Sequence, residues 1–233
     1  MENTDLEFRD WDDVPEFMRN DEVKKYYKTL SEKRFSLEVK RFFDVVMSVF
    51  LLFVLSPVFA VITVWIKLDS KGPVYYKQER ITQYGRRFHI FKFRTMIADA
   101  DKKGSLITVQ HDARITNVGK KIRKYRLDEI PQIFNILAGD MSFVGTRPEV
   151  SKYVDAYSDE MKATLLLPAG VTSEASIEYK DEDKLLKEAE DLDAVYVDQI
   201  LPEKMKWNLK AIKTYSMLYE LKILIRTVWA VFR

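Results

Sequence analysis

Asp128 and Glu129 are adjacent carboxylates that directly follow a basic run, residues 120–126. The sequence places them at the start of a helix, where two carboxylates often do no more than answer the helix dipole. Beside so many cations they have a second use. Guanidinium groups keep a carboxylate ionised and able to attack phosphorus, and the same cations and free helix amides hold phosphates. Magnesium suits such a pair, so that one carboxylate would attack phosphorus while the other holds the metal.

The composition of the 233-residue chain restricts any other chemistry. It contains no cysteine, which excludes disulfides, thiolate zinc sites and cysteine nucleophiles. The two histidines, His89 and His111, are too few for a histidine zinc site. The net charge is only +2, but residues 67–126 carry 16 basic and 5 acidic side chains, whereas residues 1–22 and 155–193 are acidic. The basic block is therefore the candidate anion site.

An uncharged apolar segment extends from Val45 to Ile66. As a helix it would be about 33 Å long, enough to span a bilayer, and it lacks the polar stripe of a soluble core helix. Ser56-Pro57 lies in its middle, and because proline removes a backbone donor we expect a helix–break–helix there. Both flanks are basic, so the positive-inside rule is satisfied on both sides only by a re-entrant segment. A proline-kinked single pass is the alternative.

Asp44 stands at the start of this segment, three residues after Arg41 and four after Lys40. This spacing puts opposite charges on one helix face. Because a carboxylate near hydrocarbon is costly unless it is paired, we expect an ion pair with Lys40 or Arg41.

The predicted architecture is α+β and predominantly helical. We expect a charged N-terminal arm without a long apolar face (1–37), a re-entrant membrane helix (38–70) and a compact cytoplasmic catalytic domain (71–233). Alternation between Gly72 and Met96 predicts a β-hairpin that turns at Tyr84-Gly85. A helix is predicted from Asp128 to Leu137, ended by Gly139, and further helices over 181–199 and 203–232. The last is amphipathic, and either lies in the membrane interface or packs on the core.

Taken together, these motifs resemble those of the bacterial sugar transferases, the monotopic phosphoglycosyl transferases that begin glycan assembly on polyprenyl phosphate. The resemblance covers about residues 38–232. It rests on Lys40-Arg41-Phe42-Phe43-Asp44, Ser56-Pro57, Gly72-Pro73-Val74 with Gln78-Glu79-Arg80, residues 91–96, Arg123 with Leu127-Asp128-Glu129-Ile130-Pro131-Gln132, and residues 139–149.

The resemblance implies a reaction and a place for it. Asp128 would be the nucleophile and Glu129 the Mg²⁺ ligand; Asp128 would attack the sugar-linked phosphate of a nucleotide diphosphate sugar, a UDP-sugar, and polyprenyl (undecaprenyl) phosphate would then accept the phosphosugar. The phosphate-binding residues would be Arg123, Arg147, Lys92 and Arg94. The protein would lie among lipids at the cytoplasmic face of the bacterial inner membrane, in exopolysaccharide or lipopolysaccharide synthesis. A homodimer is left open.

The chain departs from the family pattern at two places. Thr146 replaces a proline before Arg147, which loosens the preceding turn. More seriously, Pro168–Ile177 replaces the usual Pro-Gly-Ile-Thr-Gly and Trp-Ala-Gln-Val runs, and the effect of this change on nucleotide-sugar recognition is left open. Asp193 matches an acidic residue that precedes the Tyr196-Val197 pair; support of the site and an ordinary exposed charge are both open.

Two other functions fit part of the pattern. A membrane-anchored adaptor without catalysis would use the basic block for anionic lipid headgroups, but it would not place an Asp-Glu pair among its cations. A nucleic-acid binder would use aromatic residues interleaved with cations, but the apolar segment argues against it, and we expect no nucleic-acid partner. The sequence leaves open the sugar, the nucleotide, the glycan pathway and the oligomeric state.

Overall fold

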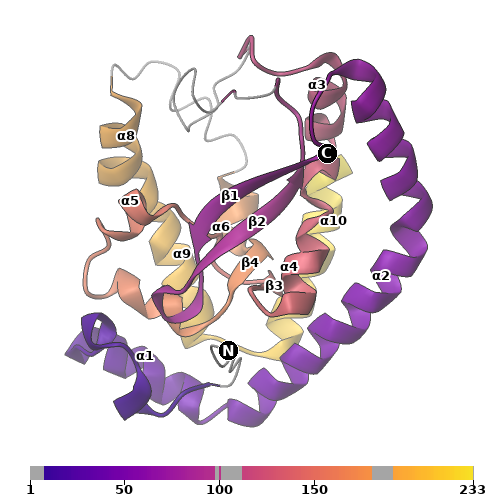
Figure 1. Cartoon of the computed structure of the whole chain (residues 1–233). Helices are drawn as coiled ribbons and strands as arrows, with labels where there is room; N and C mark the ends of the chain where they lie inside the picture. Colours follow the sequence, from indigo (N-terminus) through magenta and orange to yellow (C-terminus); the bar gives the residue numbers. More distant parts are fainter. Residues whose placement is uncertain (1–7, 98–99, 101–111, 180–190, 233) are drawn as a thin grey trace.

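A computed structural model describes residues 8–97, 100, 112–179 and 191–232. The predominantly helical α+β fold is confirmed. Helix α2 (Arg34–Asp69) forms an arc around the outside, and a hairpin of β1 (Tyr75–Ile81) and β2 (Arg87–Phe93) lies within it (Figure 1). The remaining larger elements are α1 (Asp21–Ser31), α3 (Asn117–Lys124), α4 (Gln132–Ala138), α9 (Leu201–Lys213) and α10 (Met217–Phe232).

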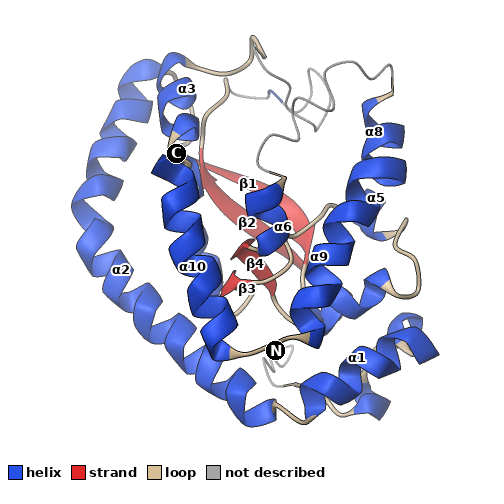
Figure 2. Ribbon diagram, turned by 180° about the vertical axis from the view of Figure 1, so that it is seen from behind, coloured by secondary structure: helices blue, strands red, loops and turns tan. Residues whose placement is uncertain are grey.

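Two small two-stranded sheets lie between these helices (Figure 2). The predicted hairpin is confirmed: β1 and β2 are antiparallel, and the chain turns at Tyr84 and Gly85, which have positive φ angles of 57° and 77°. The second sheet was not predicted. It pairs β3 (Met141–Val144) in parallel with β4 (Ala169–Thr172), and strands of four residues are too short to give a readable alternation.

Helix α2 runs through Pro57 without interruption, so the predicted break at Ser56-Pro57 is wrong. The reason is local. Proline removes the N–H that would bond to the carbonyl of Phe53, and the Ser56 hydroxyl donates to that carbonyl instead, at 2.8 Å. The helix therefore bends as an arc rather than breaking. It also begins at Arg34, so the predicted domain boundary at residue 38 falls inside it.

The outer side of α2 is apolar. The helix is long and apolar enough to cross a membrane, and only 17% of its most apolar 18-residue stretch is buried. Phe53 and Leu68 are 82% and 81% exposed, whereas the buried residues Asp44, Ser48 and Ile62 lie on one inner stripe. A soluble protein's curved surface helix normally turns a polar face outward. This exposed apolar face disfavours a soluble core helix.

The inner side of α2 is attached to the body by polar contacts at its first turns. Arg41 donates to the carbonyls of Ile136 and Leu137, which end α4, at 2.6 and 3.0 Å. Lys40 forms a buried ion pair with Glu220 of α10 at 2.6 Å. Of the two partners predicted for Asp44, Lys40 is therefore wrong, whereas Arg41 interacts electrostatically with Asp44. Asp44 also accepts the backbone N–H of Phe143 at 3.3 Å.

The N-terminal arm is part of the main core, contrary to the expectation that it lacks an apolar face. Val23, Tyr26 and Leu30 of α1 are buried, as is Met18 before it. They pack in one cluster with residues of α9 and of the 3₁₀ turn Met161–Leu166. The apolar residues of α1 recur every three or four positions, but the surrounding charged residues, acidic and basic, hid this short pattern.

The predicted C-terminal helix is two helices. α9 packs on the core through Met205, Leu209 and Ile212, whereas α10 exposes apolar side chains, Leu218 and Trp229 most of all. Packing on the core is therefore confirmed for α9, whereas a place in the membrane interface stays a prediction for α10. Of the helix predicted over 181–199, residues 181–190 lie outside the described residues; the rest form α8 (Leu192–Val195) and a π turn, Tyr196–Ile200.

Candidate active site

Asp128 and Glu129 lie in a 3₁₀ turn, Leu127–Glu129, rather than in the first turn of a helix as predicted. α4 begins only at Gln132, directly after Pro131, and proline suits the start of a helix because its missing N–H would have no partner there. Arg126, which precedes the turn, adopts a left-handed conformation with φ 53°, a costly geometry for a residue with a side chain. The pair is therefore presented on a strained connection.

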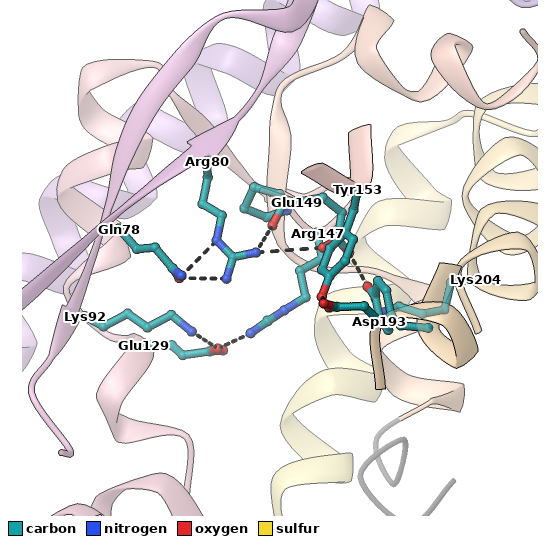
Figure 3. A network of polar contacts seen from close by, with 11 residues as sticks. Gln78, Arg80, Lys92, Glu129, Arg147, Glu149, Tyr153, Asp193 and Lys204 are labelled. Carbon is teal, nitrogen blue, oxygen red and sulfur yellow. Dashed lines mark hydrogen bonds and ion pairs between the residues drawn. The ribbon is translucent and has the colours of Figure 1, made fainter. Parts of the chain in front are cut away.

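Glu129 is held by two cations from distant parts of the chain (Figure 3). Its Oε1 accepts a hydrogen bond from Lys92 Nζ at 3.0 Å and another from Arg147 Nη2 at 2.8 Å. Lys92 comes from β2, and Arg147 from the segment that follows β3. The structure thus brings together three of the residues predicted for the site.

Burial and charge oppose each other at these groups. Burial alone would raise the pKa of Glu129, but Arg147 and Lys92 outweigh it and hold the pKa well below its usual range. Burial lowers the pKa of Lys92, although Glu129 opposes that shift. Glu129 is therefore an ionised carboxylate at neutral pH, fixed between two cations.

Asp128 has a different environment from its neighbour. Burial and the adjacent Glu129 charge raise the pKa of Asp128, against the effects of Lys92 and Arg123. Within the described part of the chain, no side chain forms a hydrogen bond or ion pair with its carboxylate. Lys92 and Arg123 do lower the pKa of this carboxylate, as expected of nearby cations, but burial outweighs them and the net shift is upward. A carboxylate with a raised pKa and no ion-pair partner is the more nucleophilic of the two once it is ionised.

The other two predicted phosphate-binding residues are placed differently. Arg123 of α3 is close enough to Asp128 to affect its pKa, and donates to Thr95 Oγ1 at 3.5 Å. Arg94 is buried and donates to the carbonyl and hydroxyl of Ser70, at the end of α2. Arg123 is therefore at the pair, whereas Arg94 is committed to the end of α2.

The segment 146–149 carries Arg147 and is fixed at several points. β3 and β4 come so close at its start that a Cβ added to Gly170 would lie 2.1 Å from the nitrogen of Gly145. The carbonyl of Thr146 accepts the N–H of Gly170 at 2.8 Å. At the other end, the carbonyl of Glu149 accepts the N–H of Ile81 at 2.9 Å. Arg147 is thus held by backbone contacts on both sides.

Sequence reasoning missed the residues behind Arg147. Arg80 donates to the carbonyl of Pro148 at 3.2 Å and lies 3.8 Å from the buried carboxylate of Glu149. Glu149 also accepts from the hydroxyl of Tyr196 at 2.6 Å, and Lys204 donates to that hydroxyl at 3.2 Å. Arg80 and Glu149 stand inside the motifs quoted above, but no sequence spacing links residues so far apart.

Asp193 is tied to α5 (Ser151–Val154) rather than to the Asp-Glu pair. It accepts from Lys152 Nζ and from the hydroxyl of Tyr153, each at 2.5 Å, and it is partly exposed. It is therefore a support for the packing of α8 against α5.

The segment that departs from the family pattern packs against α10. It forms β4 and then α6 (Glu174–Glu178), with Ser173 as the cap that accepts the N–H of Ser176. Arg226 of α10 forms ion pairs with Glu174 and Glu178 at 2.8 and 2.7 Å. The altered residues therefore link β4, beside Arg147, to the C-terminal helix.

The acidic pair fits a magnesium ion of the kind that binds with substrate. Among the described residues, no cluster of three or more acidic or histidine side chains forms a closed metal cage. Magnesium commonly uses one or two carboxylates and takes its other ligands from phosphates and water. Both cations bond to Oε1 of Glu129, which leaves Oε2 as the atom through which this residue could hold a metal. The donor set thus suits a metal that arrives with a diphosphate.

Comparison with known proteins agrees with this chemistry. A model of the bacterial sugar transferase family matches residues 35–233. The UDP-N-acetylgalactosamine-undecaprenyl-phosphate N-acetylgalactosaminephosphotransferase of Aeromonas hydrophila is 42% identical over 123 residues, 53% of this chain and 29% of that protein. The UDP-glucose:undecaprenyl-phosphate glucose-1-phosphate transferase of Klebsiella pneumoniae is 32% identical over 194 residues, 82% of this chain and 39% of that protein. This chain spans less than half the length of both relatives.

A relative of similar size is the uncharacterized sugar transferase EpsL of Bacillus subtilis (strain 168). It is 34% identical over 190 residues, which are 82% of this chain and 85% of that protein. The match to the family model extends from α2 to the C-terminal helix and includes the buried pair with its cations. A non-catalytic membrane adaptor is not favoured by these relationships. The chain belongs to the bacterial sugar transferase family, a family of enzymes.

Proposed function

We propose that this protein transfers a sugar 1-phosphate from a UDP-sugar to undecaprenyl phosphate, through an aspartyl phosphosugar, and so begins the assembly of a membrane glycan. The observation that carries the proposal is the division of labour in the Asp-Glu pair. Glu129 is ionised between Lys92 and Arg147, whereas Asp128 beside it has no ion-pair partner among the described residues. The Aeromonas and Klebsiella relatives, by name, act on undecaprenyl phosphate and UDP-sugars.

The reaction has two displacements at one phosphorus. A carboxylate oxygen of Asp128 attacks the sugar-linked phosphorus, and the bond to the bridging oxygen breaks, so that UMP leaves with the electron pair. A phosphate oxygen of undecaprenyl phosphate then attacks the same phosphorus, and the Asp128 carboxylate is released. Arg123 and Arg147 balance charge on the phosphate oxygens. Bound Mg²⁺ would further neutralise the diphosphate, with Glu129 Oε2 as its protein ligand.

We also propose that α2 is re-entrant and that the protein lies at the cytoplasmic face of the bacterial inner membrane. Both ends of α2 pack on the same body: Lys40 and Arg41 contact α10 and α4, whereas Ile62 and Ile66 pack with Phe93 and α3. A single pass would carry these ends to opposite sides of the bilayer. The exposed apolar side of the arc is the part that would enter the lipid.

Two isosteric substitutions test the chemical roles. Asp128→Asn leaves an amide too weak to attack phosphorus, so turnover should fall to background and no labelled phosphosugar should attach to the protein. Glu129→Gln keeps the nucleophile but loses one charge between Lys92 and Arg147, so turnover should fall severely and excess magnesium should restore part of it. The measurement is acid trapping of a phosphosugar from a panel of UDP-sugars, before acceptor is added.

The two-step route also predicts ping-pong kinetics and UMP release in the absence of undecaprenyl phosphate. Lys124→Gln, an exposed change on the neighbouring helix, is the matched control and should keep wild-type turnover. Substantial turnover by Asp128→Asn, or no trapped intermediate on the wild-type protein, would remove the covalent role of Asp128.

A further inference from the structure

A π turn, Tyr196–Ile200, interrupts the helical path from α8 into α9 close to the site. Tyr196 is its first residue and Lys204 follows eight positions later; both are buried. A π turn adds one residue to a helix, and such insertions are frequent at functional sites. The function proposed above gives Tyr196 and Lys204 no role in the chemistry.

The added residue decides which side chains share a face of the helix. In an uninterrupted α-helix, eight residues rotate by about 800°, which would leave Lys204 about 80° away from Tyr196. When a π turn absorbs one residue, the rotation corresponds to about seven residues and the two side chains differ by only about 20°. Lys204 Nζ accordingly lies 3.2 Å from the Tyr196 hydroxyl and 5.2 Å from the centre of its ring.

The Tyr196 hydroxyl, placed in this way, contacts the segment that carries Arg147. It donates to Glu149 Oε1 at 2.6 Å, and Glu149 is only 5% exposed. Arg80 approaches the other carboxylate oxygen of Glu149 at 3.8 Å and donates to the carbonyl of Pro148. Arg147 comes directly before Pro148 and Glu149 in the chain, and its side chain donates to Glu129 (Figure 3).

We propose that Tyr196 is a positioning residue for Arg147: the π turn and Lys204 hold its hydroxyl on Glu149, which fixes segment 146–149 so that the Arg147 guanidinium points at Glu129. This inference rests on the proposed function, because it assigns Tyr196 to the transfer reaction. Tyr196 itself touches neither the Asp-Glu pair nor, in this account, the substrate.

The test is Tyr196→Phe, which removes the hydroxyl and keeps the ring. Tyr153→Phe is the matched control, because the two rings are 4.7 Å apart but the Tyr153 hydroxyl donates to Asp193 instead. In the full chain in nanodiscs, we expect Tyr196→Phe to lower kcat about tenfold, since a displaced cation weakens charge stabilisation at phosphorus. Tyr153→Phe should stay within about twofold of wild type.

A second background separates positioning from a general loss of packing. When Arg147→Lys is already present, the short ammonium no longer depends on the geometry of segment 146–149, so Tyr196→Phe should lower kcat by less than about twofold. If Tyr196→Phe costs the same factor in both backgrounds, its effect does not pass through Arg147 and the inference is overturned.

Hydrogen exchange provides a readout that does not need turnover. Amide exchange in peptides covering 144–150 should rise in Tyr196→Phe and stay at the wild-type rate in Tyr153→Phe. Equal exchange in the two variants overturns the inference, whatever the substrate. If exchange follows the expected pattern but the wild-type protein turns over no UDP-sugar, the proposed function fails while the link from Tyr196 to segment 146–149 stands.

Discussion

Two neighbouring carboxylates have opposite electrostatic situations in this protein. Glu129 forms ion pairs with Lys92 and Arg147, which lower its pKa despite its burial. The pKa of Asp128 is raised by burial and by the charge of Glu129 itself. Neighbouring carboxylates whose environments push their pKa values apart take different chemical roles. The two side chains differ by only one methylene. Their environments therefore decide that Asp128 is the nucleophile and that Glu129 is the fixed negative charge.

This assignment predicts a pH dependence. Asp128 must be ionised to attack, so kcat/KM should fall as pH drops through its raised pKa, at a pH above the ordinary range for aspartate. Arg123 lowers that pKa, so Arg123→Gln should move the acid limb to higher pH in profiles measured between about pH 5 and pH 8. Lys124→Gln removes an exposed charge from the same helix and should leave the limb in place. An unshifted limb in Arg123→Gln would contradict the electrostatic account of Asp128.

At the scale of elements, α2 is unusual in packing on one body at both ends while exposing an apolar outer face. The chain has no cysteine, so each introduced thiol is unique. Glu38→Cys and Lys71→Cys place thiols at exposed positions near the two ends of the helix. A re-entrant helix should leave both open to a membrane-impermeant maleimide in inside-out vesicles, and both protected in intact spheroplasts. Labelling from opposite sides would establish a single pass.

The sequence predicted the elements whose signals are local. The hairpin was readable because β1 and β2 alternate over seven residues each, and the end of α4 because Gly139 takes a positive φ of 84°. The continuity of α2 was not readable. Pro57 argues for a break, and only the geometry reveals that the Ser56 hydroxyl replaces the lost donor at Phe53.

The site was predicted in part for the same reason. Asp128, Glu129, Arg123 and Arg147 lie in motifs, and Lys92 lies on a strand with a clear pattern. Arg94 shares that strand motif, yet its contact with Ser70 depends on where α2 ends in space. The ion pair of Lys40 with Glu220 joins residues 180 positions apart, which no spacing on one helix could indicate.

On the scale of the whole molecule, the N-terminal arm belongs to the folded body that carries the site. Leu30 is fully buried in a cluster that also contains Tyr196 and Met205. Leu30→Ala should therefore lower the free energy of unfolding by about 3 kcal/mol, measured by urea titration in detergent micelles. Lys28→Ala, on the exposed side of α1, should change it by less than about 0.5 kcal/mol. If Leu30→Ala unfolds with the same free energy as the wild-type protein, the arm is not part of the folded core.

The curved form of α2 has a mechanical consequence for the bilayer. In the proposed arrangement the arc adds volume to the cytoplasmic leaflet alone and acts as a wedge that spreads the lipids there. A wedge inserts more easily where that leaflet is already stretched, so the protein should partition into vesicles of about 30 nm in preference to vesicles of about 200 nm. Flotation of the two sizes with equal lipid area measures this, and equal partitioning would contradict one-leaflet insertion. Membrane curvature would then set how much of this enzyme a given region of membrane holds.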